Sequence, residues 1–310
     1  MKLQFYNSIT SQKEEFKPMS NNEVLVYGCG PTVYNAPHIG NFRTFVFYDL
    51  INRVLMQNGY TVRNVINITD IDDKIIDRIN NENVTFDDLT KKYERLFLDQ
   101  SALLNILPST INPRASEYIS DMIDFIKSLI DQGNAYEING NIFFDTKAYK
   151  KYGKFVNIDD ESLSIEEDEL GKKHPNDFAL WKAWKESDGK ITWESDWGNG
   201  RPAWHTECAV LGTQLLGKSI DIHCGGIDLK FPHHENESAQ VEALLGNQFA
   251  NYWLHAEHLI FDSEKMSKSL GNTLDISDLL EKYSPETIRL FLLSSHYRSK
   301  VSFSNKKLDD

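Results

Sequence analysis

A strand–loop–helix–strand pattern near the N-terminus constrains the fold of this chain more than any other feature. Residues 24–27 form a short apolar run, and from Ile39 onward apolar residues recur at helical spacing. Gly59 ends this helix, and a second apolar run over residues 62–68 has the composition of a buried strand. Two strands joined by a helix predict a βαβ unit with a right-handed crossover. The loop over residues 28–38 is therefore expected at the carboxyl edge of a parallel sheet, where proteins of this type bind ligands.

The composition is that of an ordinary folded protein, with 40% hydrophobic and 25% charged residues among 310. No apolar run reaches the roughly 18 residues of a membrane span, and the start, MKLQFYNSIT, lacks the features of a signal peptide. We therefore expect a cytoplasmic protein without membrane contact. Three scattered cysteines argue against a disulfide framework and leave free thiols or metal ligands. A net charge of -13 argues against a generally basic surface, although a local basic stripe can still hold phosphates.

The middle of the chain departs from the βα pattern, and we interpret residues 101–199 as an insertion. It contains two short apolar runs joined by Asn139-Gly140, a dipeptide typical of a type I′ hairpin turn. An acidic stretch, residues 159–170, is most simply a solvated loop. The sheet pattern resumes near residue 220. The predicted domains are a catalytic domain in two halves, residues 1–100 and 200–254, the insertion, and a C-terminal region over residues 255–310.

Two polar motifs far apart in the chain have the composition of phosphate-binding elements. His38, Gly40 and Asn41 fall in the first turn of the first predicted helix, where unpaired N–H groups and the helix dipole favour an anion. A polar helix cap explains the same residues as well. Lys265 and Lys268 belong to the segment DSEKMSKSLGN, and such flexible charges can follow the charge that develops during phosphoryl transfer. Alone, this segment is also compatible with an exposed loop carrying ordinary lysines.

The order and spacing of these motifs resemble the class I aminoacyl-tRNA synthetases, whose paired signatures are His-x-Gly-[His/Asn] and Lys-Met-Ser-Lys-Ser. Within that class the chain resembles the cysteinyl-tRNA synthetase family, in the segments CGPTVYNAPHIGNFRTF, NITDIDDKI, GRPAWHTEC, DIHCGGIDLKFPHHENE and EKMSKSLGN. The resemblance covers nearly the whole chain. It implies an α/β fold, a Rossmann-like parallel-sheet catalytic domain with an inserted connective α+β subdomain. It also implies ATP-dependent activation of L-cysteine to cysteinyl-adenylate, followed by transfer to the 3′ terminal adenosine of tRNA(Cys).

In the family that the chain resembles, one zinc ion lies at the floor of the amino-acid pocket. Carried over by position, its ligands are Cys29, Cys208, His233 and Glu237, a set that suits tetrahedral zinc. Taken alone, Cys29 or Cys208 is also compatible with a small buried apolar residue. Cys224 matches no ligand position. Because a thiol becomes a thiolate on zinc while a serine hydroxyl does not, cysteine is selected at binding, and we predict no editing domain.

The same resemblance assigns the rest of the site. It implies cysteine-binding roles for Gly30, Thr32, Thr69 and Trp204, although Thr69 is also compatible with a strand end and Trp204 with a core aromatic. Gly226 and Asp228 are expected near the ribose of ATP. His38, Gly40 and Asn41 would hold the phosphates, Lys265 and Lys268 would stabilise the departing pyrophosphate, and Mg²⁺ would bind through the phosphates. Because the substrate carboxylate itself attacks the α-phosphorus, no protein general base is needed.

The sequence departs from the family pattern at its end. Members usually continue into a helical anticodon-binding domain, whereas this sequence stops at SNKKLDD. We therefore expect a monomer that forms the adenylate, and the choice of the correct tRNA is left open. The acceptor arm is expected to contact basic residues near the end of the chain: Arg298, Lys300, Lys306 and Lys307.

Two other functions stay open at this point. A related ligase, which transfers cysteine to a sugar amine in mycothiol-type biosynthesis, resembles this chain in the first motif and the zinc thiolates. It lacks the second glutamate of HHENE, so Glu237 favours the synthetase. The other alternative is a non-catalytic zinc-containing tRNA-binding module, and the intact His38, Asn41, Lys265 and Lys268 argue against it.

Overall fold

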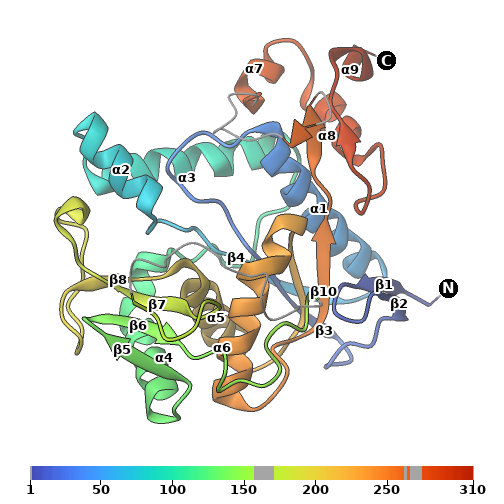
Figure 1. The fold of residues 1–310 in the computed structure, drawn as a ribbon. Helices are drawn as coiled ribbons and strands as arrows, with labels where there is room; N and C mark the ends of the chain where they lie inside the picture. Colours follow the sequence, from blue (N-terminus) through green and yellow to red (C-terminus); the bar gives the residue numbers. More distant parts are fainter. Residues whose placement is uncertain (1, 157–170, 262–263, 266–273, 310) are drawn as a thin grey trace.

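A four-stranded parallel sheet forms the centre of the computed structural model, which describes residues 2–156, 171–261, 264–265 and 274–309. Its strands lie in the order β10–β9–β3–β4 (Figure 1). Their bounds are Glu23–Gly28 for β3, Thr61–Ile66 for β4, Ile220–Gly226 for β9 and Ala250–Ala256 for β10. Strands β3 and β9 are hydrogen-bonded neighbours although the whole middle of the chain separates them in sequence. The predicted α/β fold with a parallel sheet is confirmed.

Helix α1 (Ile39–Gln57) joins β3 to β4, as the sequence predicts. Its first turn is closed by a capping box, in which the backbone N–H of Asn41 donates to His38 Nδ1 at 3.3 Å and the N–H of His38 donates to Asn41 Oδ1 at 3.0 Å. Strand β4 is shorter than expected and ends at Ile66. Beyond Ile66 the regular pairing with β3 stops, and Thr69 forms an isolated parallel bridge with Thr32 in the loop that follows β3.

Apolar side chains cover both faces of the central sheet. On one face Val26, Ile66 and Leu254 belong to a core with α1, α3 (Phe86–Leu103) and α8 (Pro285–Leu293). Their chain neighbours Tyr27, Val65 and Trp253 belong to a second core with α4 (Ile119–Asp131), α5 (Trp204–Leu216) and α6 (Glu235–Leu245). Neighbouring residues of a strand point to opposite faces, so a strand with two apolar neighbours is buried on both sides. Helices therefore cover both faces, as in doubly wound α/β domains.

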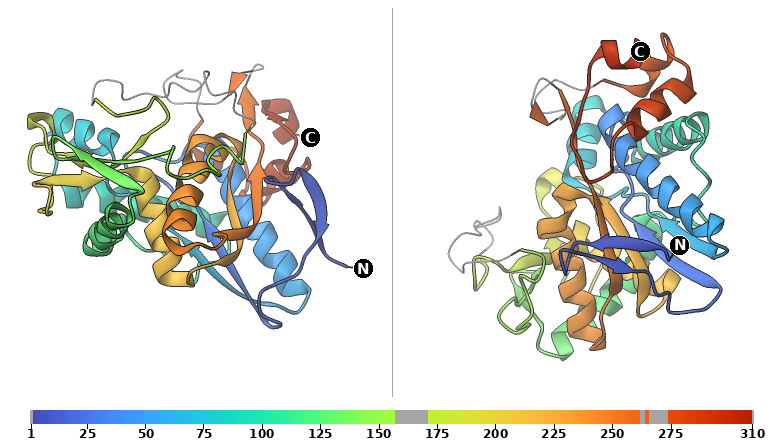
Figure 2. Two further views of the ribbon diagram at one scale, coloured as in Figure 1. Left: turned by 60° about the horizontal axis from the view of Figure 1, so that its bottom comes forward. Right: turned by 90° about the vertical axis from the view of Figure 1, so that its right-hand side faces the viewer.

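The middle of the chain forms a separate antiparallel sheet of four strands: β5 (Ala135–Ile138), β6 (Asn141–Phe144), β7 (Phe178–Ala183) and β8 (Gly200–Pro202). Asn139 and Gly140 between β5 and β6 have φ values of 53° and 79°, which confirms the predicted hairpin turn. Figure 2 shows this sheet and the C-terminal helices at opposite ends of the molecule. The predicted domain bounds stay a prediction, and the acidic stretch 159–170 lies outside the described residues.

Shorter elements complete the fold: β1 (Gln4–Asn7), β2 (Gln12–Glu15), α2 (Asp73–Glu82), β11 (Leu259–Phe261), β12 (Glu264–Lys265), α7 (Ile276–Leu280), β13 (Val301–Ser302) and α9 (Asn305–Asp309). Strands β1 and β2 form a hairpin, and β12, β11 and β13 form a small third sheet. Within the described ranges, the helices are all too short or too polar to cross a membrane.

Candidate active site and metal centre

A cavity of about 420 Å³ opens at the carboxyl edge of the central sheet, where the sequence predicts the ligand site. Its walls come from the loop after β3, the first turns of α1, α2 and α5, and the turn after β9. Cys29 lines it, together with eight residues predicted to bind cysteine or ATP: Gly30, Thr32, His38, Gly40, Asn41, Trp204, Gly226 and Asp228. A Cβ at Gly226 would lie 2.6 Å from Asp228 Oδ1, so a side chain there would displace the Asp228 carboxylate from its observed position.

Thr69 lies away from this cavity, unlike the other residues predicted to bind cysteine. Its side chain is fully buried, and its Oγ1 accepts a hydrogen bond from Asn67 Nδ2 at 2.9 Å. The backbone of Thr69 bonds with Pro31 and Val33 in the loop after β3. The structure therefore gives Thr69 a place behind the pocket wall, and a direct contact with the amino acid stays a prediction.

The lysine motif is described only in part. Lys265 lies in β12, and Lys268 falls outside the described residues. Beyond the motif the chain returns to the start of α1, where Ile39 N donates to Leu274 O at 2.9 Å and Asp275 forms a β-bridge with His38. The segment that follows the lysine motif is therefore hydrogen-bonded to the residues that open α1.

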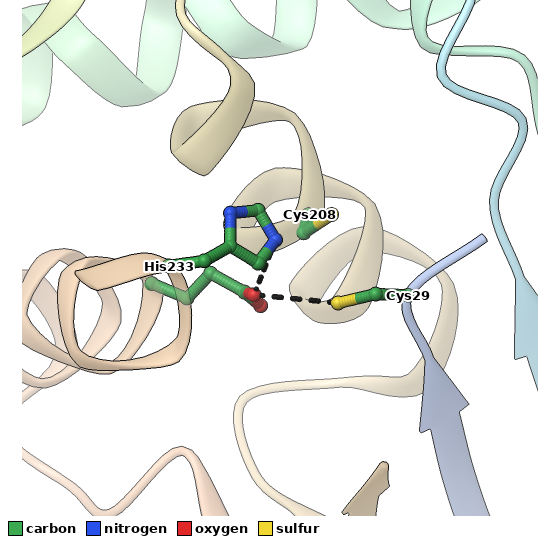
Figure 3. Close-up of side chains that lie close together, drawn as sticks. Cys29, Cys208 and His233 are labelled. Carbon is green, nitrogen blue, oxygen red and sulfur yellow. Dashed lines mark hydrogen bonds and ion pairs between the residues drawn. The ribbon is translucent and has the colours of Figure 1, made fainter. Parts of the chain in front are cut away.

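Four predicted zinc ligands, Cys29, Cys208, His233 and Glu237, lie together beside the cavity, with one donor atom of each within 4.8 Å of the others. They come from four elements: the end of β3, helix α5, the turn Lys230–His234 and the first turn of α6. Figure 3 shows the sulfur of Cys29 and the imidazole of His233 on two sides of the same carboxylate, with Cys208 beside them. All four side chains are buried. Two sulfurs, a nitrogen and a carboxylate oxygen make a donor set that suits tetrahedral zinc.

Neighbouring side chains hold these donors in place. Glu237 Oε2 lies 2.7 Å from His223 Nε2, and His233 Nδ1 lies 2.7 Å from His205 Nδ1. The ring of Trp204 stacks on His233 with centroids 4.1 Å apart. His233 Nε2 lies 2.9 Å from Glu237 Oε1 but makes no aligned hydrogen bond within the described part of the chain. A buried nitrogen placed beside three other donors in this way fits a metal ligand.

The donors are strongly coupled through their charges. Burial raises the pKa of Cys29 well above its ordinary value, and the hydrogen bond with Cys208 raises it further. At Cys208 burial is outweighed by that hydrogen bond and by His233, which lower the pKa to about 6. Burial of His233 is outweighed by Glu237 and Cys208, which raise its pKa to about 10. Burial of Glu237 is outweighed by His223 and His233, which lower its pKa to about 2. A divalent cation is the group that best balances so many ionisable donors away from water.

Sequence reasoning missed the histidines that surround this cluster. Cys29, His223, His234 and Glu237 also lie within 4.8 Å of one another, and His234 Nδ1 lies 2.8 Å from His255 Nε2. Burial lowers the pKa of His234 well below its ordinary value, so this ring is neutral. The first set has two soft thiols, whereas His223 Nε2 is occupied by Glu237, so the first set is the better zinc site. His223 is the central residue of β9 and His255 is the last but one of β10, so neither lies in a loop where the sequence pattern indicates a ligand.

A third group of possible ligands, Asp145, His174 and Asp177, lies in the insertion. Asp177 accepts hydrogen bonds from the backbone and hydroxyl of Thr146, from Tyr136 and from the backbone of His174. These bonds occupy both carboxylate oxygens. The hydrogen bonds within the insertion therefore account for the position of Asp177 without a metal ion.

Two solved structures share the fold of this chain. The catalytic domain of a methionyl-tRNA synthetase from Mycobacterium tuberculosis, solved with methionyl-adenylate, shares the fold with a TM-score of 0.70 and 16% identity, covering 93% of this chain and 67% of that one. A putative arginyl-tRNA synthetase from Campylobacter jejuni does so with a TM-score of 0.63 and 15% identity, covering 95% and 68%. The fold is thus that of class I synthetase catalytic domains.

Sequence comparison defines the family further. The model of the "tRNA synthetases class I (C) catalytic domain" matches residues 15–310, and the chain belongs to this family. It is 48% identical over 307 residues to a cysteine–tRNA ligase of Brachyspira hyodysenteriae, covering 97% of this chain, and 48% identical over 313 residues to one of Thermococcus gammatolerans, covering all of it. The chain spans 65% of the length of each of these curated relatives.

Proposed function

We propose that this chain activates L-cysteine with ATP to form cysteinyl-adenylate and pyrophosphate, and that the cysteine then passes to the terminal adenosine of tRNA(Cys). The observation that carries the proposal is the buried cluster of two thiols, an imidazole and a carboxylate at the wall of the cavity that opens beside α1. The identity to cysteine–tRNA ligases supports the same reaction.

The cluster supports selection of cysteine by its thiol. Cys29, Cys208, His233 and Glu237 would hold a zinc ion, which when bound supplies a soft Lewis acid for the substrate sulfur. Cys29 lines the cavity, so the ion would be reached from there. Trp204 stacks on His233 and lines the same wall, so it would restrict the size of the accepted side chain. A serine hydroxyl is a poor ligand for such an ion, which makes separate editing unnecessary.

The opposite wall supports binding of ATP. The N-terminus of α1 directs the positive end of its dipole toward the cavity, and Gly40 adds no side chain there. His38 and Asn41 form the cap and would also present polar edges to the phosphates. Lys265 and Lys268 would stabilise the charge on pyrophosphate, and Mg²⁺ would accompany ATP. Catalysis would consist mainly of positioning, because the amino-acid carboxylate is itself the nucleophile.

Binding of the tRNA acceptor arm is the further part of this proposal. Arg298 lies over the ring of Tyr6 at 3.2 Å, and Lys307 donates to Ser302 O, so these two side chains already support the local fold. Lys300 and Lys306 are exposed and would be the first to contact a phosphate backbone. The proposal includes a monomer in the cytoplasm, where translation takes place.

Cysteine-dependent exchange of labelled pyrophosphate into ATP tests the first half of the reaction. Exchange with cysteine and none with serine is the expected result. A folded, zinc-loaded chain that shows no exchange would instead be a non-catalytic module. If the chain catalyses pyrophosphate exchange, transfer of cysteine is then measured with tRNA(Cys) and with an amino sugar as acceptors. Transfer to the sugar amine alone would identify the thiol-cofactor ligase.

A pair of cysteine variants tests the metal centre with a matched control. Cys208→Ser removes a thiol of the cluster and is expected to weaken both zinc binding and the preference for cysteine over serine. Cys224→Ser changes an equally buried thiol that belongs to none of the possible ligand groups among the described residues, and it is expected to retain zinc. Full zinc content in Cys208→Ser by elemental analysis would contradict the ligand assignment.

A further inference from the structure

We infer that Asn67 is a positioning residue of the metal centre, which holds the Cys29 loop and the helix of Cys208 in register. Asn67 follows the last residue of β4 and is fully buried. Neither the sequence motifs nor the ligand groups assign it a role. The inference rests on the proposed function, because it concerns the same zinc site.

The side-chain oxygen of Asn67 contacts both thiol-bearing segments at once. Oδ1 accepts a hydrogen bond from the backbone N–H of Gly30, next to Cys29, at 2.9 Å. The same oxygen lies 3.8 Å from Cys208 Sγ, which is a weak hydrogen bond when Cys208 is a thiol and a packing contact when it is a metal-bound thiolate. Gly30 and Cys208 stand 37 and 141 residues from Asn67 in sequence. One amide therefore links the loop after β3, the end of β4 and helix α5.

The orientation of this amide is determined by its contacts. A flipped side chain would point Nδ2 at the N–H of Gly30, which places two donors against each other. In the observed orientation Nδ2 donates to Thr69 Oγ1 at 2.9 Å. Thr69 is in turn held by backbone bonds to the loop after β3. These contacts therefore keep Asn67 Oδ1 directed toward the segments that carry Cys29 and Cys208.

The backbone at Asn67 adds a second constraint. A Cβ on residue 30 would lie 1.5 Å from the carbonyl oxygen of Asn67, so only glycine allows this approach. The loop that carries Cys29 is therefore pressed against the end of β4. Metal ligands from separate elements need such support, because a misplaced donor weakens the site, and loss of an outer-shell partner typically costs about 10–100-fold in metal affinity.

Asn64 provides a matched control on the same strand. It is 7% exposed, and its Oδ1 accepts hydrogen bonds from the N–H and hydroxyl of Thr110 at 2.9 and 3.1 Å. It resembles Asn67 in burial and bonding, yet it makes no contact with the cluster in the described structure. Asn64→Ala should lower stability without changing the affinity for zinc.

The test compares the full chain with Asn67→Ala and Asn64→Ala by two measurements. Zinc affinity is determined by competition with a chromophoric chelator, and the ligand field is read from the visible absorption of the Co²⁺-loaded protein. Asn67→Ala is expected to weaken zinc about 10-fold or more and to shift the Co²⁺ bands. Asn64→Ala is expected to keep the affinity and spectrum of the unaltered chain. Asn67→Ala with unaltered affinity and bands would overturn the inference.

A second variant covers the case in which Asn67→Ala does not fold. Asn67→Asp keeps an acceptor opposite Gly30 but adds a negative charge near Cys208 Sγ, so the Co²⁺ bands are expected to shift although the fold is kept. Unchanged bands in Asn67→Asp would also overturn the inference. If the unaltered chain binds neither Zn²⁺ nor Co²⁺, the proposed zinc site itself is wrong, and the role of Asn67 is wrong with it.

Discussion

Asp49 on α1 offers the strongest single test of how the fold is held together. Its side chain is fully buried, and its Oδ2 pairs with Arg53 at 2.8 Å and with Arg289 of α8. Its Oδ1 accepts the backbone N–H of Leu107 at 2.9 Å. One carboxylate therefore joins α1, which begins at the cavity, to α8 near the C-terminal end of the chain.

The cost of Asp49→Ala can be worked from these contacts. Removing one partner of a buried ion pair costs about 3–5 kcal/mol, and a buried N–H left without an acceptor costs about 1–3 kcal/mol. Arg289 is 15% exposed and keeps its bonds to the carbonyls of Leu104 and Asn105. The cost of breaking the ion pair therefore lies at the low end of the first range. Leu107 is only half-buried, so loss of its acceptor costs about 1 kcal/mol. With about 3 kcal/mol for the ion pair, we expect the free energy of unfolding to fall by about 4 kcal/mol.

Urea unfolding followed by tryptophan fluorescence measures this loss. Asp87→Ala is the control, because Asp87 forms a pair with Lys91 on the exposed surface of α3 and should leave the unfolding curve unchanged. An unfolding free energy for Asp49→Ala within about 1 kcal/mol of the unaltered chain would refute the reasoning, since that is what a solvated pair contributes.

Three further changes have defined outcomes. Gly30→Ala should lower the melting temperature and the zinc affinity together, because the new methyl group collides with the Asn67 carbonyl; a variant with both unchanged would contradict the close approach. Burial alone would raise the pKa of Glu242, but Lys154 and a hydrogen bond from a tyrosine outweigh it and lower the pKa below 4.5. The ionised Glu242 side chain therefore stabilises the fold above that pH, and this stabilisation is lost as the pH falls. The stability difference between Glu242→Gln and the unaltered chain, measured by urea unfolding, should therefore be largest at neutral pH and shrink in acid; a constant difference would exclude this origin. Lys268→Ala should raise the barrier to adenylate formation by about 2–4 kcal/mol, measured by pyrophosphate exchange, and an unchanged rate would remove its proposed role.

The sequence predicts those parts of the fold whose signals are local. The periodicity after Ile39 and the turn residues Asn139 and Gly140 depend on neighbours a few positions away, and both predictions are confirmed. The early end of β4 was not predicted, because beyond Ile66 the pairing is reduced to an isolated bridge between Thr69 and Thr32, in the loop that precedes α1. An apolar run alone gives no information about a partner so distant in sequence.

The candidate site also contains residues that were predicted before the structure was known and residues that were missed. Resemblance to a family supplied Cys29, Cys208, His233 and Glu237, and the structure brings their donor atoms together. The outer residues were missed because their importance depends on packing between elements. His223, for example, became visible only when β9 and α6 were placed side by side, with its ring 2.7 Å from Glu237. His38 and Asn41 form the polar cap that the sequence also allowed, and their contacts with ATP stay a prediction.

The separation of the four donors along the chain has a consequence for biosynthesis. Cys29 leaves the ribosome early, whereas Glu237 follows 208 residues later, so most of the chain must be made before the set exists. Strand β9, which pairs with β3 in the sheet and precedes α6, is also made long after β3. A metal ion that needs all four donors can therefore be captured only after Glu237 has been made and has reached the other three. Metal content would then report how much of a newly made population has completed its fold.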